Sequence, residues 1–180
     1  MLWDLVIDVL MPTGLPSRKE REKKNEKHPD TIPVEVQVPG AFKRAMNESG
    51  ELDEQAIAVG VLRQGKQRSV LALVSGLALF EVLRPRRSKS LPREFAIAVT
   101  PHRVVAFAMS LWAEGTDTTT TLVRIKRGER GSWPRDLVRI LDRSKNILQN
   151  GATLEVAGER IPVVWESYSG TEELVDVLVG

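Results

Sequence analysis

Cysteine is absent from the 180 residues, and histidine occurs only as His28 and His102, 74 positions apart. Without cysteine the chain forms no disulfide, no thiolate zinc site and no cysteine nucleophile. The two histidines give no ligand spacing for zinc, and neither lies where a buried third group would orient it as the base of a Ser–His–Asp triad. We therefore expect a protein that is not an enzyme and holds no metal, with His102 in a surface turn.

Glycine motifs that bind phosphate are missing too. The stretches RQGKQR, RGERGS and QNGAT match neither the P-loop pattern nor the dinucleotide-binding pattern, so no cofactor is implied. Aromatic residues make up 5%, and the basic stretch VRIKRGERGSWPR contains one of them, Trp133. Because single-stranded nucleic acid is bound on several aromatics in a basic groove, we expect no specific nucleic-acid partner. Alternation predicts that Arg124 and Lys126 lie on the solvated face of a strand.

A hydrophobic run long enough to span a membrane is the third absence. The apolar stretch SVLALVSGLALFEVL, residues 69–83, contains Ser75 and Glu81. As a helix it would be about 22 Å long at about 1.5 Å per residue, and the hydrocarbon core needs about 30 Å. We predict a helix that is buried within the protein, under a barrel, against residues 56–62 or across a dimer. Shallow insertion into a membrane surface is the alternative.

Charge is distributed unevenly along the chain. The formal net charge is +2, but residues 63–93 carry eight cations against one acid, a local charge of +7. The cations Arg84, Arg86, Arg87 and Lys89 form a basic loop, residues 84–93, directly after the apolar stretch. Each Lys or Arg near an anionic membrane contributes about 1 kcal/mol to binding. These four residues are therefore the candidate site for an anionic surface.

The overall composition, 42% hydrophobic and 28% charged, is typical of a soluble globular protein. We expect three regions, of which the first, residues 1–30, is an amphipathic helix followed by a charged linker. This helix has aspartates and no cations, so docking or self-association is favoured over membrane anchoring. It also lacks the basic start of a secretory signal, so a cytoplasmic protein is expected, including one peripheral to the membrane.

The second region, residues 31–93, begins with the alternating stretch TIPVEVQVPG, which predicts an edge strand because of its prolines. Residues 41–83 are predicted to be helical, including ELDEQAIAVGVL, with a glycine stop after AFKRAMNES. Residues 84–93 form the basic loop that ends this accessory region.

The third region, residues 94–180, contains short strand-like runs with frequent turns and a last amphipathic helix, which predicts a small antiparallel barrel in a β-rich α+β fold. Residues 152–158 and 160–167 should form a hairpin about Gly158, and Ser169 with Glu172 has capping-box spacing. The predicted core is Ala96, Ile97, Val99, Val105, Phe107, Val123, Ile125, Leu154, Val156, Val163, Trp165, Leu174 and Leu178.

Three stretches resemble bacterial pleckstrin-homology-like domain proteins of unknown function over residues 95–180. FAIAVTPHRVVAF is similar to the first hairpin of such domains, GSWPRDLVRI to a later turn, and SGTEELVDVL to the helix that closes the barrel. The resemblance implies binding to lipid head groups or proteins without catalysis. Phosphoinositide-binding members carry Lys and Arg around a longer loop between the first two strands, whereas the turn here is TPHR.

These observations together predict a non-catalytic binding or scaffolding module. Its partner would be another protein, including a second copy of the same chain. The alternative is a peripheral membrane-associated domain that uses helix 69–83 and loop 84–93 on anionic lipid.

Overall fold

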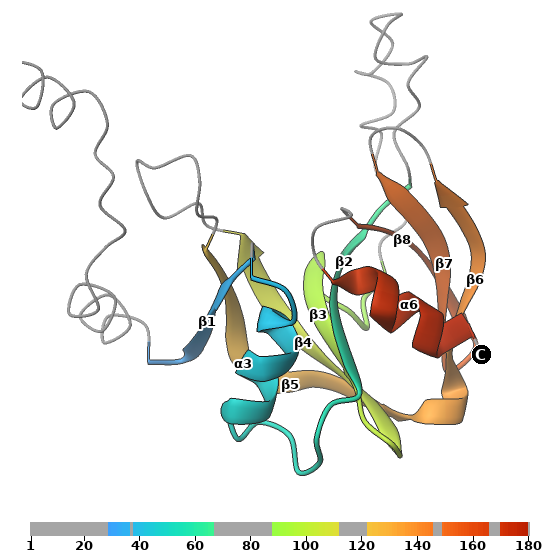
Figure 1. Ribbon diagram of the computed structural model, residues 1–180. Helices are drawn as coiled ribbons and strands as arrows, with labels where there is room; N and C mark the ends of the chain where they lie inside the picture. Colours follow the sequence, from blue (N-terminus) through green and yellow to red (C-terminus); the bar gives the residue numbers. More distant parts are fainter. Residues whose placement is uncertain are drawn as a thin grey trace, which may run out of the picture.

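The computed structural model describes residues 29–36, 38–66, 88–111, 122–145, 149–165 and 170–179. The amphipathic helix predicted at the start of residues 1–30, the helix predicted at residues 69–83 and the cap at Ser169 lie outside the described residues. Within them the chain forms a β-rich α+β fold (Figure 1).

Eight antiparallel strands form one sheet in the described part of the chain, in the order β1-β5-β4-β3-β2-β8-β7-β6. The strands are β1 (Thr31–Glu35), β2 (Ala58–Gln64), β3 (Glu94–Val99), β4 (Arg103–Leu111), β5 (Leu122–Pro134), β6 (Val138–Lys145), β7 (Asn150–Val156) and β8 (Glu159–Trp165). The helices are α3 (Ala41–Glu48), the 3-10 turn η1 (Arg135–Leu137) and α6 (Thr171–Val179). The sheet therefore combines strands from both sides of residue 94.

The structure corrects the prediction that ELDEQAIAVGVL is helical. Residues 58–64 form β2, which pairs with β3 along its length and with β8 at its end. A strand in the middle of a sheet is buried on both faces and reads as a continuous apolar run, which periodicity alone does not separate from a buried helix. The helical prediction is correct for α3, which buries Phe42 and Met46 and ends before Gly50 at φ +73°.

The strands predicted after residue 94 are present, and β1 lies at one edge of the sheet, where Pro33 was expected to place it. The strand-like stretches TLVRIKRG and GSW are parts of one long strand, β5, rather than two short ones. The hairpin about Gly158 joins β7 and β8.

All thirteen residues predicted for the barrel core are buried, but they belong to two cores on opposite faces of the central strands. In β3, Phe95, Ile97 and Val99 face one core, and Ala96 and Ala98 face the other. The first, the α6 core, contains the predicted residues Ile97, Val99, Leu154, Val156, Val163, Trp165, Leu174 and Leu178. The second, the α3 core, contains Ala96, Val105, Phe107, Val123 and Ile125.

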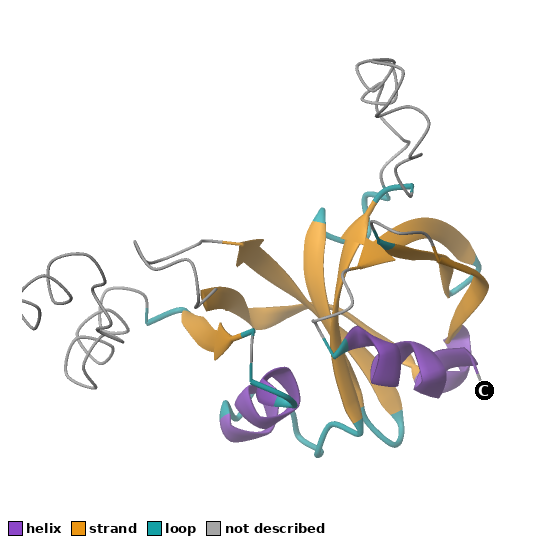
Figure 2. Cartoon of the chain, turned by 45° about the horizontal axis from the view of Figure 1, so that its top comes forward, coloured by secondary structure: helices purple, strands orange, loops and turns teal. Residues whose placement is uncertain are grey.

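The two helices cover different parts of the sheet, as Figures 1 and 2 show. Helix α3 packs on β1 and β2, and α6 packs on β2 and β6. The first residue of α6, Thr171, exchanges two hydrogen bonds with the backbone of Val61, at 2.8 and 3.1 Å. A Cβ atom at Gly60 would lie 2.7 Å from Cδ2 of Leu174, so glycine lets α6 approach β2 this closely.

A polar contact set fastens the start of α6 to β6, β7 and β8. The Glu172 carboxylate accepts hydrogen bonds from Asn150 Nδ2 at 2.6 Å, Trp165 Nε1 at 3.1 Å and Arg143 at 3.1 Å. Arg143 also pairs with Asp176 at 2.8 Å, one turn further along the helix. The predicted role of Glu172 was a capping box, whereas its described contacts join the helix to three strands.

Candidate functional site

The four residues of the predicted anionic-surface site are only partly covered by the structure. Arg84, Arg86 and Arg87 lie outside the described residues, and Lys89 is an exposed residue just before β3. The described chain on either side of residues 67–87 forms a defined structure, which we call the neck. It consists of residues 63–66, where the chain leaves β2, and residues 88–93, where it returns toward β3.

The side chain of Gln64 holds the two halves of the neck together. Its Oε1 accepts a hydrogen bond from the backbone N–H of Ser88 at 2.9 Å, and its Nε2 donates to the carbonyls of Leu91 at 2.7 Å and Pro92 at 3.0 Å. Gln64 is only 8% exposed, so these bonds replace the water that its amide would otherwise bind. The chain thus leaves and returns at one place on the fold, and residues 67–87 connect the two ends.

Cations dominate the neck. Arg63, Lys66, Lys89 and Arg93 belong to it, and Arg63 lies opposite Glu94 in the strand register. In the described part of the chain, none of the four forms an ion pair. Several arginines elsewhere are matched with acids, as in the pairs Arg103–Asp53, Arg127–Glu51, Arg139–Glu155 and Arg143–Asp176. The neck therefore carries positive charge that no described carboxylate neutralises at contact distance.

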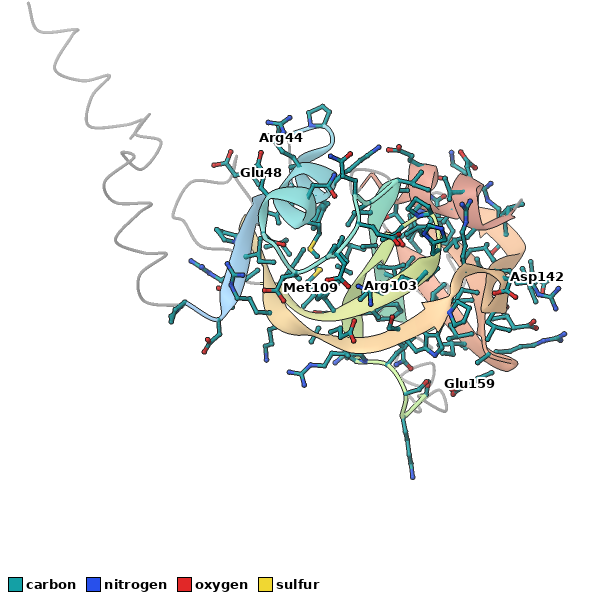
Figure 3. All side chains as sticks on the ribbon, turned by 90° about the horizontal axis from the view of Figure 1, so that it is seen from below. Arg44, Glu48, Arg103, Met109, Asp142 and Glu159 are labelled. Carbon is teal, nitrogen blue, oxygen red and sulfur yellow. The ribbon has the colours of Figure 1, made fainter. Side chains whose placement is uncertain are left out.

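Two serines of the neck and one acid of β8 form a further set of contacts. The Ser90 hydroxyl donates to Glu159 Oε2 of β8 at 2.7 Å, and the Oγ atoms of Ser88 and Ser90 are 2.5 Å apart. The backbone N–H of Ser90 donates to Ser88 Oγ at 3.0 Å. Glu159 lies at the lower rim of the molecule in Figure 3. Glu159 adds one negative charge beside the four cations Arg63, Lys66, Lys89 and Arg93, so the net charge here stays positive.

A second charged cluster surrounds the turn between β3 and β4. His102 is a surface turn residue, as predicted, with its side chain 81% exposed and Nδ1 2.9 Å from Glu54. Hydrogen bonding by the Thr100 hydroxyl and by His102 lowers the pKa of Glu54 below its usual 4.5, against an opposing effect of burial. Arg103, labelled in Figure 3, pairs with Asp53 at 2.9 Å and Glu129 at 3.5 Å.

Two further carboxylates have a lowered pKa. The pKa of Glu51 is lowered chiefly by the backbone N–H of Gly128, with burial opposing and Arg127 assisting. The pKa of Glu155 is lowered by hydrogen bonds from Arg139 and then Arg160. A carboxylate whose pKa falls is a weaker base at neutral pH, and a general base needs a pKa near the working pH. These acids act as fixed anions that fasten loops and strands together.

One prediction about β5 is wrong. Arg124 was expected on a solvated face, but it is only 3% exposed, and its guanidinium donates to the Thr31 hydroxyl at 3.4 Å. At this residue β1 and β4 pair with β5 on its two sides, so Arg124 lies in the interior of the sheet. Lys126 is exposed, as predicted, and Trp133 packs against the α6 core. Trp133 therefore contributes to the fold's packing.

Sequence reasoning missed Gln64 because its partners are 24 to 28 residues away along the chain. A glutamine at the end of an apolar run carries no signal of such contacts.

The described residues contain no group of three or more His, Cys, Asp or Glu side chains placed to hold a metal ion. None of the described helices has the length and hydropathy of a membrane-spanning segment. No protein-family model, curated protein or solved structure with which the chain was compared matches it, so the neck is interpreted from its own chemistry.

Proposed function

We propose that the chain is a non-catalytic binding module that associates with an anionic membrane surface through the neck. The observation that carries this proposal is the set of four cations, Arg63, Lys66, Lys89 and Arg93, without an ion pair in the described part of the chain. Cations that are not neutralised by the protein's own acids attract anionic head groups over about a Debye length, about 8 Å at physiological salt.

The sequence between the two ends of the neck supports the same partner. Residues 67–87 contain the apolar stretch 69–83 and the cations Arg68, Arg84, Arg86 and Arg87. An apolar stretch enclosed by cations matches both layers of a membrane surface, the anionic head groups and the acyl chains beneath them. Both faces of β3 pack against other described elements. The α6 core and the α3 core are therefore built from residues outside 67–87.

The strand order also supports the pleckstrin-homology-like resemblance when β2, instead of β3, is taken as the first strand. Strands β2 to β5 form one meander and β6 to β8 another, joined where β2 pairs with β8, and α6 packs at this junction. With β2 as the first strand, the first hairpin is β2–β3 and its connection is residues 65–93. The basic loop then lies between the first two strands, where lipid-binding members of that superfold carry their cations. In this arrangement β1 and α3 are additions.

Co-sedimentation with lipid vesicles tests the proposal. We expect full-length protein to pellet with vesicles that contain phosphatidylserine and to stay in solution with phosphatidylcholine alone. The variant K66Q/K89Q/R93Q should bind about a hundredfold more weakly, because three cations contribute about 1 kcal/mol each. Added salt should weaken the binding of the unaltered protein.

A matched control removes the same charge elsewhere. Lys126, Arg130 and Lys145 are exposed and form no ion pair with any described acid. The variant K126Q/R130Q/K145Q should keep most of its vesicle binding, because none of its three substituted residues belongs to the neck. Equal losses in the two variants would assign binding to net charge, and no pelleting at low salt would refute the proposal.

A protein partner, including a second copy of this chain, is the second candidate. The apolar stretch 69–83 favours it, because the helix predicted there from the sequence would be apolar nearly all round and would need burial against something. Light scattering coupled to size exclusion, without detergent, distinguishes the two candidates. A monomer in solution that pellets with anionic vesicles supports the lipid proposal, and a stable dimer that ignores vesicles supports self-association.

A further inference from the structure

Ser90 is the exposed hydroxyl of the neck. Its Oγ donates to Glu159 Oε2 at 2.7 Å, on the surface of the molecule. Ser88 differs, because it is half-buried and the Gln64 side chain contacts both its backbone N–H and its carbonyl, at 2.9 and 3.4 Å. Of the two hydroxyls, that of Ser90 is the more accessible to another protein.

The residues before Ser90 are strongly basic. In the stretch RPRRSKS, Arg86 and Arg87 precede Ser90 by four and three positions, and Lys89 adjoins it. Enzymes that modify serine choose substrates by the charge pattern around the acceptor, and an acidic substrate cleft pairs with arginines placed in this way. Ser90 therefore combines an exposed hydroxyl with basic residues at the preceding positions.

We propose that Ser90 is a phosphorylation site for a serine kinase that selects basic substrates. In the reaction, Ser90 Oγ forms a bond to the γ-phosphorus of a nucleoside triphosphate, and the bond from that phosphorus to the bridging β-phosphate oxygen breaks. The hydroxyl proton passes to the base of the kinase, and the nucleoside diphosphate leaves. Ser90 becomes a phosphoserine.

Phosphorylation would change both the hydrogen bonding of Ser90 and the charge of the neck. The Ser90 hydroxyl now donates to Glu159, whereas a phosphate at the same atom is an acceptor that Glu159 repels. A phosphate adds a charge of about −1.5 to −2 at neutral pH, to a segment, residues 63–93, whose charge is +7. Where the proposed lipid binding holds, phosphorylation would weaken it by electrostatic repulsion. This consequence rests on the proposed function, and the modification site does not.

Phosphorylation of purified full-length protein tests the site. We expect a kinase that requires arginine three positions before serine, supplied with ATP, to add one phosphoryl group to the unaltered protein and to S88A. The variant S90A should lose this incorporation, and R86Q/R87Q should incorporate at least about tenfold less, because the acidic substrate cleft loses two charged contacts. Peptide mass spectrometry locates the modified residue. Incorporation that persists in S90A, or none in the unaltered protein, would overturn the proposal.

Folding and lipid binding are checked separately. Thermal unfolding should give S90A and S88A the same cooperative transition as the unaltered protein, since neither hydroxyl belongs to a core and Gln64 binds the backbone of Ser88, which S88A retains. The phosphorylated protein is then compared with the unmodified protein on vesicles that contain phosphatidylserine. Modification at Ser90 without any vesicle binding by either form supports the site and refutes the proposed function. Vesicle binding without modification refutes the site alone.

Discussion

The neck and the rest of the described structure, which we call the body, differ in how their charged residues are paired. In the body, several arginines form ion pairs that join different elements: Arg143 fastens α6 to β6, and Arg127 fastens the segment after α3 to β5. In the neck, the polar partner that joins distant segments is the neutral amide of Gln64, and the surrounding cations have no described acid. The ion pairs of the body connect elements of the fold, whereas we propose that the cations of the neck bind a partner.

The largest effect should come from deleting part of the body. Removing the segment between the ends of the neck, residues 67–87, should have a smaller effect. A chain that starts at Leu91 lacks β1, α3 and β2, and β2 lies between β3 and β8 in the sheet. We expect this truncated chain to aggregate without a cooperative unfolding transition, because it leaves β3 unpaired on one side and exposes both cores. Circular dichroism and light scattering measure this outcome.

Replacing residues 67–87 by a short Gly–Ser linker is the matched experiment. Gln64 and its partners remain, and a shorter loop lowers the entropy cost of closure only slightly. The replaced chain should keep a cooperative transition, with a free energy of unfolding within about 1 kcal/mol of the unaltered value. A replaced chain that fails to fold would return residues 69–83 to the core, where sequence analysis placed them.

The difference between predicted and observed structure has a physical origin in two particular strands. Residues 95–99 were predicted correctly as a strand, but FAIAV contains no polar residue, and its two apolar faces lie in two cores instead of one. The same burial on both faces made β2 appear helical in the sequence. Periodicity identifies a buried residue, but it does not state which of two cores contains it.

The contacts of the candidate site were less predictable than the fold. Exposure of Lys89 and the positive charge around it follow from composition along the chain, and both are visible in the sequence. The clamp by Gln64, the contact of Ser90 with Glu159 and the burial of Arg124 depend on residues that are far apart in sequence. Such contacts appear only once the strand order is known.

A smaller effect should follow from crowding the contact between α6 and the body. In Gly60→Ala, the added Cβ would lie 2.7 Å from Leu174 Cδ2 and 2.9 Å from Thr171 Cα, so α6 must shift away from β2. Overpacking of this kind costs about 1–3 kcal/mol. Urea unfolding should show this loss, whereas the exposed substitution Lys126→Ala should change stability by less than about 0.5 kcal/mol. An unchanged Gly60→Ala protein would mean that α6 is not seated as described.

The smallest predicted effect concerns the pH dependence of an ion pair in the body. The pKa of Glu51 is lowered in the folded state from its usual 4.5, because the backbone N–H of Gly128, and then Arg127, bind its ionised form. The unfolded chain therefore takes up the proton at a higher pH, and the stability from Glu51 is present above about pH 4.5 and lost as the pH falls through the lower folded pKa. In Glu51→Gln, we expect a loss of about 1 kcal/mol at pH 7, and a weaker decline in stability below pH 4.5 than in the unaltered protein. Glu48→Gln removes a carboxylate that forms no ion pair among the described residues and serves as the control. If both variants follow the same curve of unfolding free energy against pH, Glu51 does not fasten the segment after α3 to β5, and the contrast between body and neck loses one of its supports.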